Sequence, residues 1–332
     1  MSRAEESFWG QAQPETKLSK LKTAPRRKKR NPLLLIQASK IGFNLVEMMK
    51  RIFLPVLGIV VVASAVCLVS PNFEAAQSPA DEHVKLELVS EQNALVSGEE
   101  LFLGIRFDLK EGWHTYWVNP GDSGEAPRIE WQLPVGFQAG PIQWPYPERL
   151  VTAPFADYGY KHQVLLMAPI RLPARLRAGE TENIAAQVHY LICHDVCIPG
   201  QKQLVLSLPV QSRPAASLSR ELFATARARV PKPKPRSWKI SAASLGDEFV
   251  LNLQTEELTK MLQFFPLHAE QIENAASQEM TVFPGGVRLH LKKSNHLLKP
   301  IARLQGVIVL DSERAYSVDV PVSPSSKMST RD

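Results

Sequence analysis

Two cysteines close together in the sequence, Cys193 and Cys197, are the residues of this chain best suited to covalent chemistry. They lie in the segment YLICHDVCIPG. Fully extended, residues four apart lie roughly 13 Å apart, whereas a disulfide requires Cα atoms within about 7 Å. A bond between these two cysteines therefore requires a turn, which Asp195 and the following Pro199–Gly200 permit.

The residues alone leave three uses of the pair open. Thiol-disulfide exchange needs a thiolate, which a protonated His194 would favour and Asp195 would oppose. Two soft thiolates with His189 or His194 nearby also suit copper(I), as in a copper-binding or copper-tolerance module. A structural staple is the third use, but so short a loop stabilises the fold by only about 2 kcal/mol. Redox exchange is the interpretation we favour.

Other catalytic motifs are weak or missing. Residues 121 to 124 read GDSG, which imitates the nucleophile motif of trypsin-like proteases, where a serine needs a histidine base and a buried aspartate. Only His83 and His114 precede it, with no room for the first barrel of such an enzyme, so a polar turn is the better interpretation. The sequence also has no GxGxxG, P-loop lysine motif, HExxH or GxSxG. We expect no cofactor beyond the cysteine pair itself.

The elements that position the pair follow a period of two. Apolar residues alternate with polar ones on both sides of the cysteines, which is typical of half-buried antiparallel strands separated by Pro/Gly turns. The pattern predicts an all-β fold, with a β-sandwich over residues 81–212. The alternating positions include Val84, Leu86 and Leu88; Leu101, Leu103, Ile105 and Phe107; Ile129 and Trp131; Ile184, Ala186, Val188 and Tyr190; and Leu204, Leu206 and Leu208.

A second region repeats the pattern. Residues 213–237 read as a Pro/Lys-rich linker, with a short helix expected near Leu218 to Ala228. Alternation resumes over residues 238–322 and predicts a second, smaller β-sandwich domain. Residues 323–332 are expected to be a frayed tail.

The N-terminal part has a different character. Residues 1–51 hold 12 Lys/Arg and 4 Asp/Glu, whereas the rest of the 332-residue chain holds 27 and 29, so the body of the protein is slightly acidic and does not indicate a nucleic-acid surface. Residues 52–73 carry no charge and contain the third cysteine, Cys67. They are expected to be a signal peptide or membrane anchor, with residues 1–51 cytoplasmic or, if translation begins at Met48 or Met49, untranslated. Everything after about residue 70 is then exported.

Several longer segments resemble one known family. The exported part resembles the periplasmic N-terminal region of the DsbD family of thiol:disulfide interchange proteins, most closely its ScsB-like branch. The segments that carry this resemblance are GWHTYWVNPGDSGEAPRIEWQLPVGF (112 to 137), GPIQWPYPERL (140 to 150), DYGYKHQVLL (157 to 166), YLICHDVCIPG (190 to 200), FFPLHAEQIENAA (264 to 276), and LQGVIVL with YSVDVPV (304 to 322).

The resemblance implies more than the residues show. It implies an immunoglobulin-like domain whose reactive pair, Cys193 and Cys197, takes electrons from a membrane-embedded thiol reductase of the DsbD/CcdA type. The pair would pass them to thioredoxin-like periplasmic clients, with Cys197 contacting the client and Cys193 resolving. It also implies a cap that shields the cysteines, for which Phe155 and Tyr158 are the nearest matches; ordinary core packing is the equal alternative for these two aromatics.

The resemblance has a clear departure. Neither the polytopic membrane domain nor the thioredoxin-like domain of full-length members follows residue 322. We therefore expect a periplasmic electron carrier of the thiol:disulfide oxidoreductase type. It would depend on other proteins for the functions of these two domains.

Overall fold

The structure, a computed structural model, describes residues 78–256 and 259–324, and strands dominate it. Within these ranges the helical elements are a short 3-10 helix, η1 (Pro79–Glu82), and one α-helix, α3 (Arg220–Ala228). The all-β prediction is confirmed. The predicted membrane segment, residues 52–73, lies outside the described residues, as do residues 1–51. Among the residues that the structure does describe, no helix is long and apolar enough to cross a membrane.

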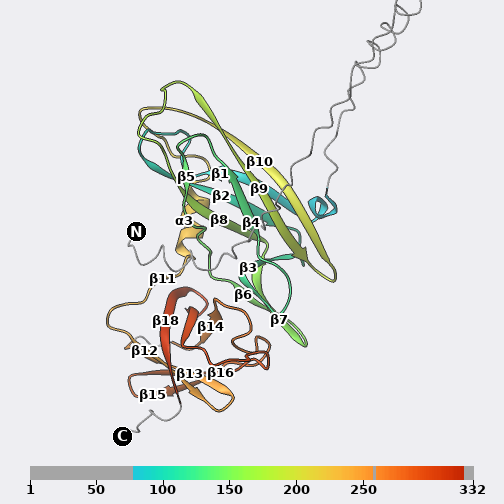
Figure 1. The fold of residues 1–332 in the computed structure, drawn as a ribbon, viewed down its shortest axis with the longest axis vertical. Coiled ribbons are helices and arrows are strands. Elements are labelled where there is room, and N and C mark those ends of the chain that lie inside the picture. Colours follow the sequence, from blue (N-terminus) through green and yellow to red (C-terminus); the bar gives the residue numbers. More distant parts are fainter. Residues whose placement is uncertain (1–77, 257–258, 325–332) are drawn as a thin grey trace, which may run out of the picture. The chain divides into compact units, whose positions relative to one another are not determined.

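The first sandwich is formed by ten strands in two sheets (Figure 1). One sheet has the order β1-β2-β8-β5; the other has the order β10-β9-β3-β7-β6, with β4 paired to β9. The strands are β1 (Val84–Ser90), β2 (Glu100–Leu109), β3 (His114–Gly121), β4 (Arg128–Gln132), β5 (Gln138–Ala139), β6 (Glu148–Thr152), β7 (Phe155–Lys161), β8 (Gln163–Arg171), β9 (Thr181–Cys193) and β10 (Cys197–Pro209).

Alternation along the strands explains the core of the first sandwich. In β2 the residues Leu103, Ile105 and Phe107 are fully buried, and in β9 the same is true of Ile184 and Val188. Successive side chains of a strand point to opposite faces of the sheet, so each strand contributes every second residue to the space between the sheets. Burial of these apolar surfaces is the main favourable contribution to folding.

The segment predicted as a linker carries ordered elements. Helix α3 packs through Phe223 and Ala226 against Leu165 and Met167 of β8, on the outer face of that sheet. The helix begins at Arg220, two residues after the predicted start at Leu218, and Leu218 itself is fully exposed. Strand β11 (Lys232–Pro233) follows and pairs in parallel with β18 (Arg314–Pro324) of the second region. This part of the Pro-rich stretch is therefore paired with the second domain.

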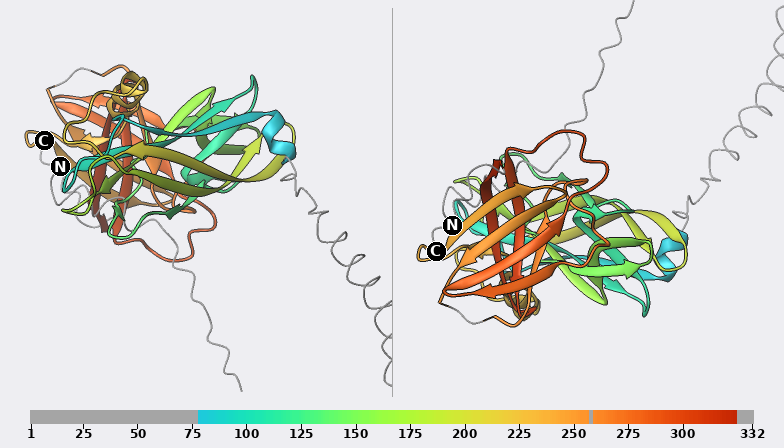
Figure 2. Two further views of the ribbon diagram at one scale, coloured as in Figure 1. Left: turned by 90° about the horizontal axis from the view of Figure 1, so that it is seen from above. Right: turned by 90° about the horizontal axis from the view of Figure 1, so that it is seen from below.

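The second domain is built on seven further strands around its own core. Their order is β14-β17-β18-β12-β13-β16-β15, and in Figure 2 the orange strands cross the red ones. The end of β18 pairs with β12 through Ser323 and Pro324, so the strand runs two residues into the predicted tail. The strands are β12 (Lys239–Leu245), β13 (Glu248–Gln254), β14 (Leu262–Pro266), β15 (Glu279–Phe283), β16 (Gly286–Lys292), β17 (Arg303–Leu310) and β18 (Arg314–Pro324).

Strand β17 joins the two cores. Its residues Ile308 and Leu310 belong to the core of the second domain, whereas Val307 and Val309 belong to the same hydrophobic cluster as the core of the first sandwich. This explains the uninterrupted apolar run VIVL, because a strand that is covered on both faces needs apolar residues at every position.

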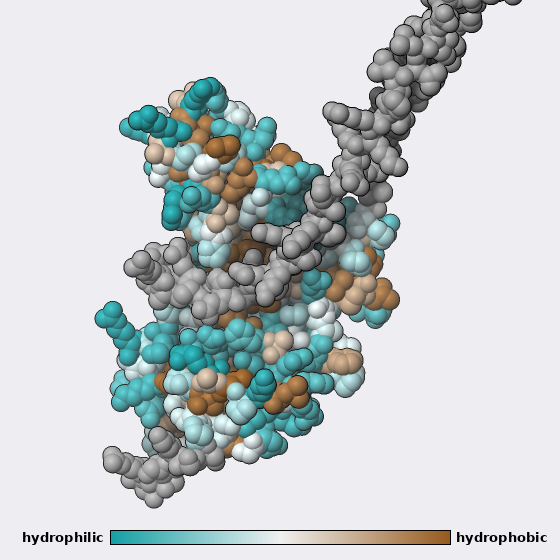
Figure 3. Space-filling model, viewed as in Figure 1, coloured by the Kyte–Doolittle hydropathy of each residue, from teal (hydrophilic) through white to brown (hydrophobic). Residues whose placement is uncertain are grey.

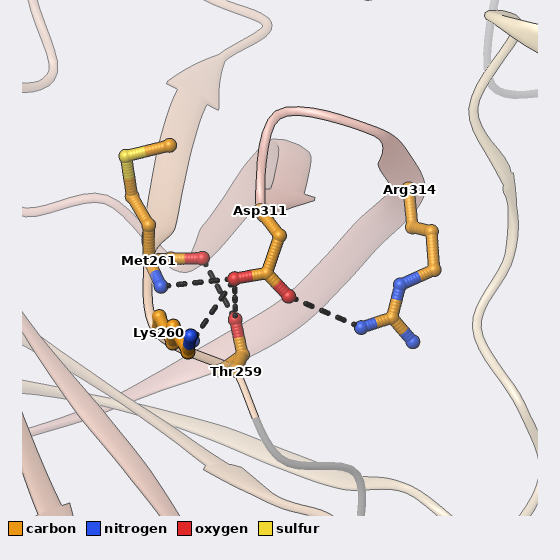
Figure 4. A network of polar contacts seen from close by, with 5 residues as sticks. All are labelled: Thr259, Lys260, Met261, Asp311 and Arg314. Atoms are coloured by element: carbon orange, nitrogen blue, oxygen red, sulfur yellow. Dashed lines mark hydrogen bonds and ion pairs between the residues drawn. The ribbon is translucent and has the colours of Figure 1, made fainter.

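A carboxylate organises the turn between β17 and β18 (Figure 4). Asp311 accepts hydrogen bonds from the backbone N–H groups of Lys260 and Met261, at 2.9 and 3.2 Å, and from the hydroxyl of Thr259 at 3.1 Å. Its second oxygen accepts from Arg314 at 3.3 Å. The bond from Lys260 is the largest cause of a lowered pKa of Asp311. The network connects the turn to the start of β14.

Exposed apolar side chains are scattered, and Figure 3 shows separate hydrophobic patches among hydrophilic residues on one face. Single exposed apolar residues are normal on soluble proteins. One of them, Val196, lies between the two cysteines and is 61% exposed. Val205 of β10 is equally exposed, so exposure alone does not distinguish the turn between the cysteines.

Candidate functional site

The two cysteines form a disulfide at the closed end of a hairpin. Strand β9 ends at Cys193 and β10 begins at Cys197, and the two residues face each other in the antiparallel ladder with Cα atoms 4.1 Å apart. The N–H of His194 donates to the carbonyl of Val196 at 3.1 Å, which closes the turn between them. The turn that a disulfide requires is therefore present between the two cysteines. Pro199 and Gly200, which were expected to form part of a turn, instead lie in β10 and pair with Leu191 and Tyr190.

The two half-cystines differ in their exposure to solvent. Cys193 is 2% exposed, whereas Cys197 is an exposed residue. An attacking thiolate must approach along the sulfur-sulfur axis. The sulfur atom that is accessible to solvent is therefore the one that can be attacked. The arrangement favours attack on Cys197, with Cys193 as the leaving sulfur.

A tyrosine contacts the buried sulfur. The hydroxyl of Tyr116, in β3, donates a hydrogen bond to Sγ of Cys193 at 2.8 Å and lies 3.8 Å from Sγ of Cys197. Tyr116 is completely buried. Burial, with a smaller contribution from Asp157, raises the pKa of its hydroxyl, so Tyr116 keeps its proton at neutral pH. Sequence reasoning missed this residue; its only signal was its place in the aromatic segment GWHTYW.

Two histidines flank the disulfide. His114 pairs with Cys193 across strands β3 and β9, and its ring lies 5.3 Å from the ring of Tyr116 in an edge-to-face arrangement. Burial lowers the pKa of His114, and its Nε2 atom is buried with no hydrogen-bond partner among the described residues. His194 forms an ion pair with Asp195 at 2.9 Å on the surface. The two neighbours predicted to influence the thiolate in opposite directions thus pair with each other.

The GDSG segment is a polar turn, as expected. Asp157 accepts hydrogen bonds from the N–H and the hydroxyl of Ser123, both at 2.8 Å. Gly124 adopts a positive φ of +81°, and a Cβ atom there would lie 2.1 Å from Cζ of Tyr116. Only glycine lets the turn pack this closely on the ring. The turn therefore covers the tyrosine that contacts the sulfur.

The same turn also contacts the second domain. Asn274 donates to Asp122 at 2.7 Å and accepts a hydrogen bond from the hydroxyl of Tyr158 at 2.8 Å. Its carbonyl accepts from the guanidinium of Arg149. Asn274 is 4% exposed. These contacts connect the second domain with the GDSG turn and with strands β6 and β7 of the first sandwich.

The two residues predicted as a shield have different surroundings. Tyr158 is completely buried, and its ring packs edge to face on Phe265 of the second domain, which supports the alternative of ordinary core packing for this residue. Phe155 is 55% exposed and lies at the β6–β7 hairpin, opposite Thr152. The shield at Phe155 stays a prediction. The hydroxyl that contacts the disulfide belongs to Tyr116 of β3.

The described residues contain no cluster of three or more His, Cys, Asp or Glu side chains arranged to hold a metal ion. Of the histidines considered for copper(I), His189 lies 3.9 Å from Glu130, and His194 pairs with Asp195.

Comparison with known proteins finds a family model that matches part of the chain. Residues 85–209 match the family model described as "Thiol:disulfide interchange protein DsbD, N-terminal". A search among curated proteins finds no match.

Similar solved structures include one with a clear likeness. It is the crystal structure of the N-terminal periplasmic domain of ScsB from Proteus mirabilis, with 18% identity and a TM-score of 0.57, covering 74% of this chain and 96% of that one. This likeness extends over both domains and concerns the fold. A protein of unknown function from Porphyromonas gingivalis W83 (10% identity, TM-score 0.21, covering 73% and 98%) and the E. coli chaperone DraB (9%, 0.19, 71% and 97%) are too distant to support an argument.

Proposed function

Since residues 85–209 match the family model of the DsbD N-terminal domain of thiol:disulfide interchange proteins, we propose that this chain relays reducing equivalents in the periplasm. It takes them from a membrane-embedded thiol reductase of the DsbD/CcdA type and passes them to thioredoxin-like clients. The observation that carries the proposal is the disulfide of Cys193 and Cys197, with one residue buried and the other exposed. A structural staple needs no such difference, whereas an exchange reaction needs one accessible sulfur.

The exchange proceeds in balanced steps. A thiolate of the membrane reductase attacks Sγ of Cys197, the bond to Cys193 breaks, and Cys193 takes the electron pair as a thiolate. A second thiolate of the reductase then attacks the mixed disulfide and releases Cys197. The reduced pair carries two electrons. In the second half of the cycle Cys197 attacks the client disulfide, and Cys193 resolves the resulting mixed disulfide, which reforms the bond between the two cysteines.

The proposed location follows from the sequence and the family. Disulfide exchange of this kind operates outside the cytoplasm, where disulfides persist. Export by residues 52–73, as signal peptide or anchor, would place the pair in the periplasm and close to a membrane partner. The small reactive surface at the end of a long hairpin is suited to brief contacts with two partners in turn.

Trapping tests the proposal in cells. Cys193→Ala removes the resolving sulfur, so Cys197 should remain attached to its partner as a mixed disulfide, seen as a larger species on a non-reducing gel that disappears with reductant. Cys197→Ala should trap far less, because the remaining Cys193 is buried. Mass spectrometry of the adduct identifies the partner.

The double variant C193A/C197A is the matched control. It keeps Cys67, so a mixed disulfide formed by Cys67 would still be seen with this variant. Equal trapping by all three variants would contradict the relay. So would a pair that stays oxidised at potentials below about −300 mV, where structural disulfides lie. In either case the structural staple would be the better account.

A further inference from the structure

Tyr116 is the side chain that the structure aims at the buried sulfur. Its hydroxyl lies 2.8 Å from Sγ of Cys193, against 3.8 Å from Sγ of Cys197. The contact is therefore directed mainly at the sulfur that leaves when Cys197 is attacked. The hydrogen bond from a hydroxyl to the neutral sulfur of a disulfide is weak. The hydrogen bond from the same hydroxyl to a thiolate is charge-assisted, and such bonds are about twice as strong as neutral ones.

The position of the hydroxyl is fixed from several sides. His114 packs on the edge of the Tyr116 ring, and the turn of Gly124 packs on the ring so closely that a Cβ there would overlap it. The backbone of Tyr116 pairs with Gly159 of β7. Because the ring is fully buried, little reorganisation is needed when charge develops on the sulfur, which is the condition for effective electrostatic stabilisation.

We propose that Tyr116 is a catalytic residue of the exchange reaction, whose hydroxyl stabilises the Cys193 thiolate that forms when Cys197 is attacked. This inference rests on the proposed function for its role in the cycle, but its chemistry concerns this chain alone. As the S–S bond breaks, the electron pair moves to Cys193 and the hydrogen bond from Tyr116 shortens onto a charged acceptor. Tyr116 keeps its proton, so the step remains balanced without another reactant.

Other groups near the sulfur do not supply this stabilisation as directly. Burial lowers the pKa of His114, which favours its neutral form. His194 is paired with Asp195 at the surface. The carboxylate of Asp157 would disfavour a nearby thiolate, because both groups are negatively charged. Lys161 of β7 has the favourable charge, but it is an exposed residue. A buried thiolate without a donor would be costly, since an ion transferred from water into a protein needs a partner.

The test measures the thiol pKa of Cys193 directly. In the full chain carrying Cys197→Ala, the 13C shift of a labelled Cys193 Cβ is followed against pH, and the measurement is repeated after Tyr116→Phe. Losing a charge-assisted hydrogen bond should raise the thiol pKa by about one to two units. Tyr160→Phe is the matched control, because it removes the hydroxyl of another buried tyrosine, which donates to the carbonyl of Pro145 at 2.7 Å. It should leave the pKa of Cys193 unchanged.

A second measurement uses the intact disulfide. Cleavage by dithiothreitol at pH 7 should be roughly tenfold slower in Tyr116→Phe, because a leaving thiol of higher pKa leaves more slowly. Tyr160→Phe should stay within about twofold of the unchanged chain. If Tyr116→Phe does not fold, replacement of Tyr116 by 3,5-difluorotyrosine provides a stronger donor of nearly the same shape. It should lower the pKa of Cys193.

The outcomes separate this inference from the proposed function. A pKa of Cys193 that does not change in Tyr116→Phe or with difluorotyrosine overturns the role of Tyr116, even if trapping succeeds. A shifted pKa together with failed trapping supports the role of Tyr116 at the sulfur and rejects the relay.

Discussion

The first sandwich and the second domain use the same alternation of apolar and polar residues, but their strand ladders differ in regularity. In the second domain the β12–β13, β13–β16 and β17–β18 ladders run without a shift in register. In the first sandwich the β3–β7 ladder shifts between Tyr116 and Gly121. Residues at regular positions fill the cores. Around its shift, β3 directs Tyr116 to the disulfide and Trp117 and Asn119 towards the second domain.

The comparison shows what an irregular strand provides. Just before the shift in register, the hydroxyl of Tyr116 contacts the sulfur of Cys193. Within the shifted segment, Trp117 packs edge to face on Phe265, and the side chain of Asn119 donates to the carbonyl of Pro266 at 2.8 Å. Bulges are known to redirect side chains and to occur beside active sites. One short segment of β3 therefore serves the candidate site and the contact between the two domains.

The largest expected effect is on stability and concerns Trp117. The side chain is completely buried and contacts Phe265 of the second domain, so Trp117→Ala should lower the free energy of unfolding by about 3–5 kcal/mol. Urea denaturation of the full chain measures this. Val135→Ala is the control, since Val135 is 99% exposed and its change should stay within about 0.5 kcal/mol. Equal losses of unfolding free energy in Trp117→Ala and Val135→Ala would mean that the shifted part of β3 does not belong to the core.

A smaller effect is expected from the contact between the domains. Asn274→Ala leaves the buried hydroxyl of Tyr158 without its acceptor and removes the donor to Asp122, which should cost about 1–3 kcal/mol in the free energy of unfolding. Asn252→Ala is the matched control in a regular ladder, where the asparagine accepts from Arg288 at 2.9 Å; it should cost less.

A double-mutant cycle sharpens this prediction. Combined with Tyr158→Phe, the cost of Asn274→Ala should fall, because the unpaired hydroxyl is no longer present. Additive costs would show that the hydrogen bond of Tyr158 does not hold the domains together.

The smallest expected effect is a dependence of stability on pH from His114. Burial lowers its pKa below the ordinary value of 6.5, so the unfolded chain binds a proton more readily than the folded one. The contribution is fully present above pH 6.5 and is lost as the pH falls through the lower pKa of the folded state. Denaturation midpoints should therefore decrease on acidification below about pH 6.5.

His114→Gln should reduce this slope, whereas the exposed His296→Gln should not change it. The same slope in His114→Gln and in the unchanged chain would show that other groups cause the acid sensitivity.

Much of the fold and the reactive pair could be predicted from the sequence. Alternation such as that of Leu101, Leu103 and Ile105 indicates strands locally, because the period of two follows from backbone geometry. The pair Cys193 and Cys197 stands out by residue type and spacing. The core position of Tyr158 against Phe265 could not be read from the sequence, because it depends on strand order and register. Tyr116 shares the segment GWHTYW with three other aromatic or histidine side chains, and nothing local distinguishes it.

The sequence by itself determined the elements and the chemistry available: strands from alternation, and two cysteines whose spacing a turn at Asp195 could close. Those properties depend on neighbours along the chain. Only the tertiary structure decided that Cys193 is buried and Cys197 exposed, that Tyr116 donates to the buried sulfur, and that the second domain contacts the adjoining turn through Asn274. These depend on which strands pair and in which register, and such long-range pairing follows from the packing of the whole sandwich rather than from any local segment.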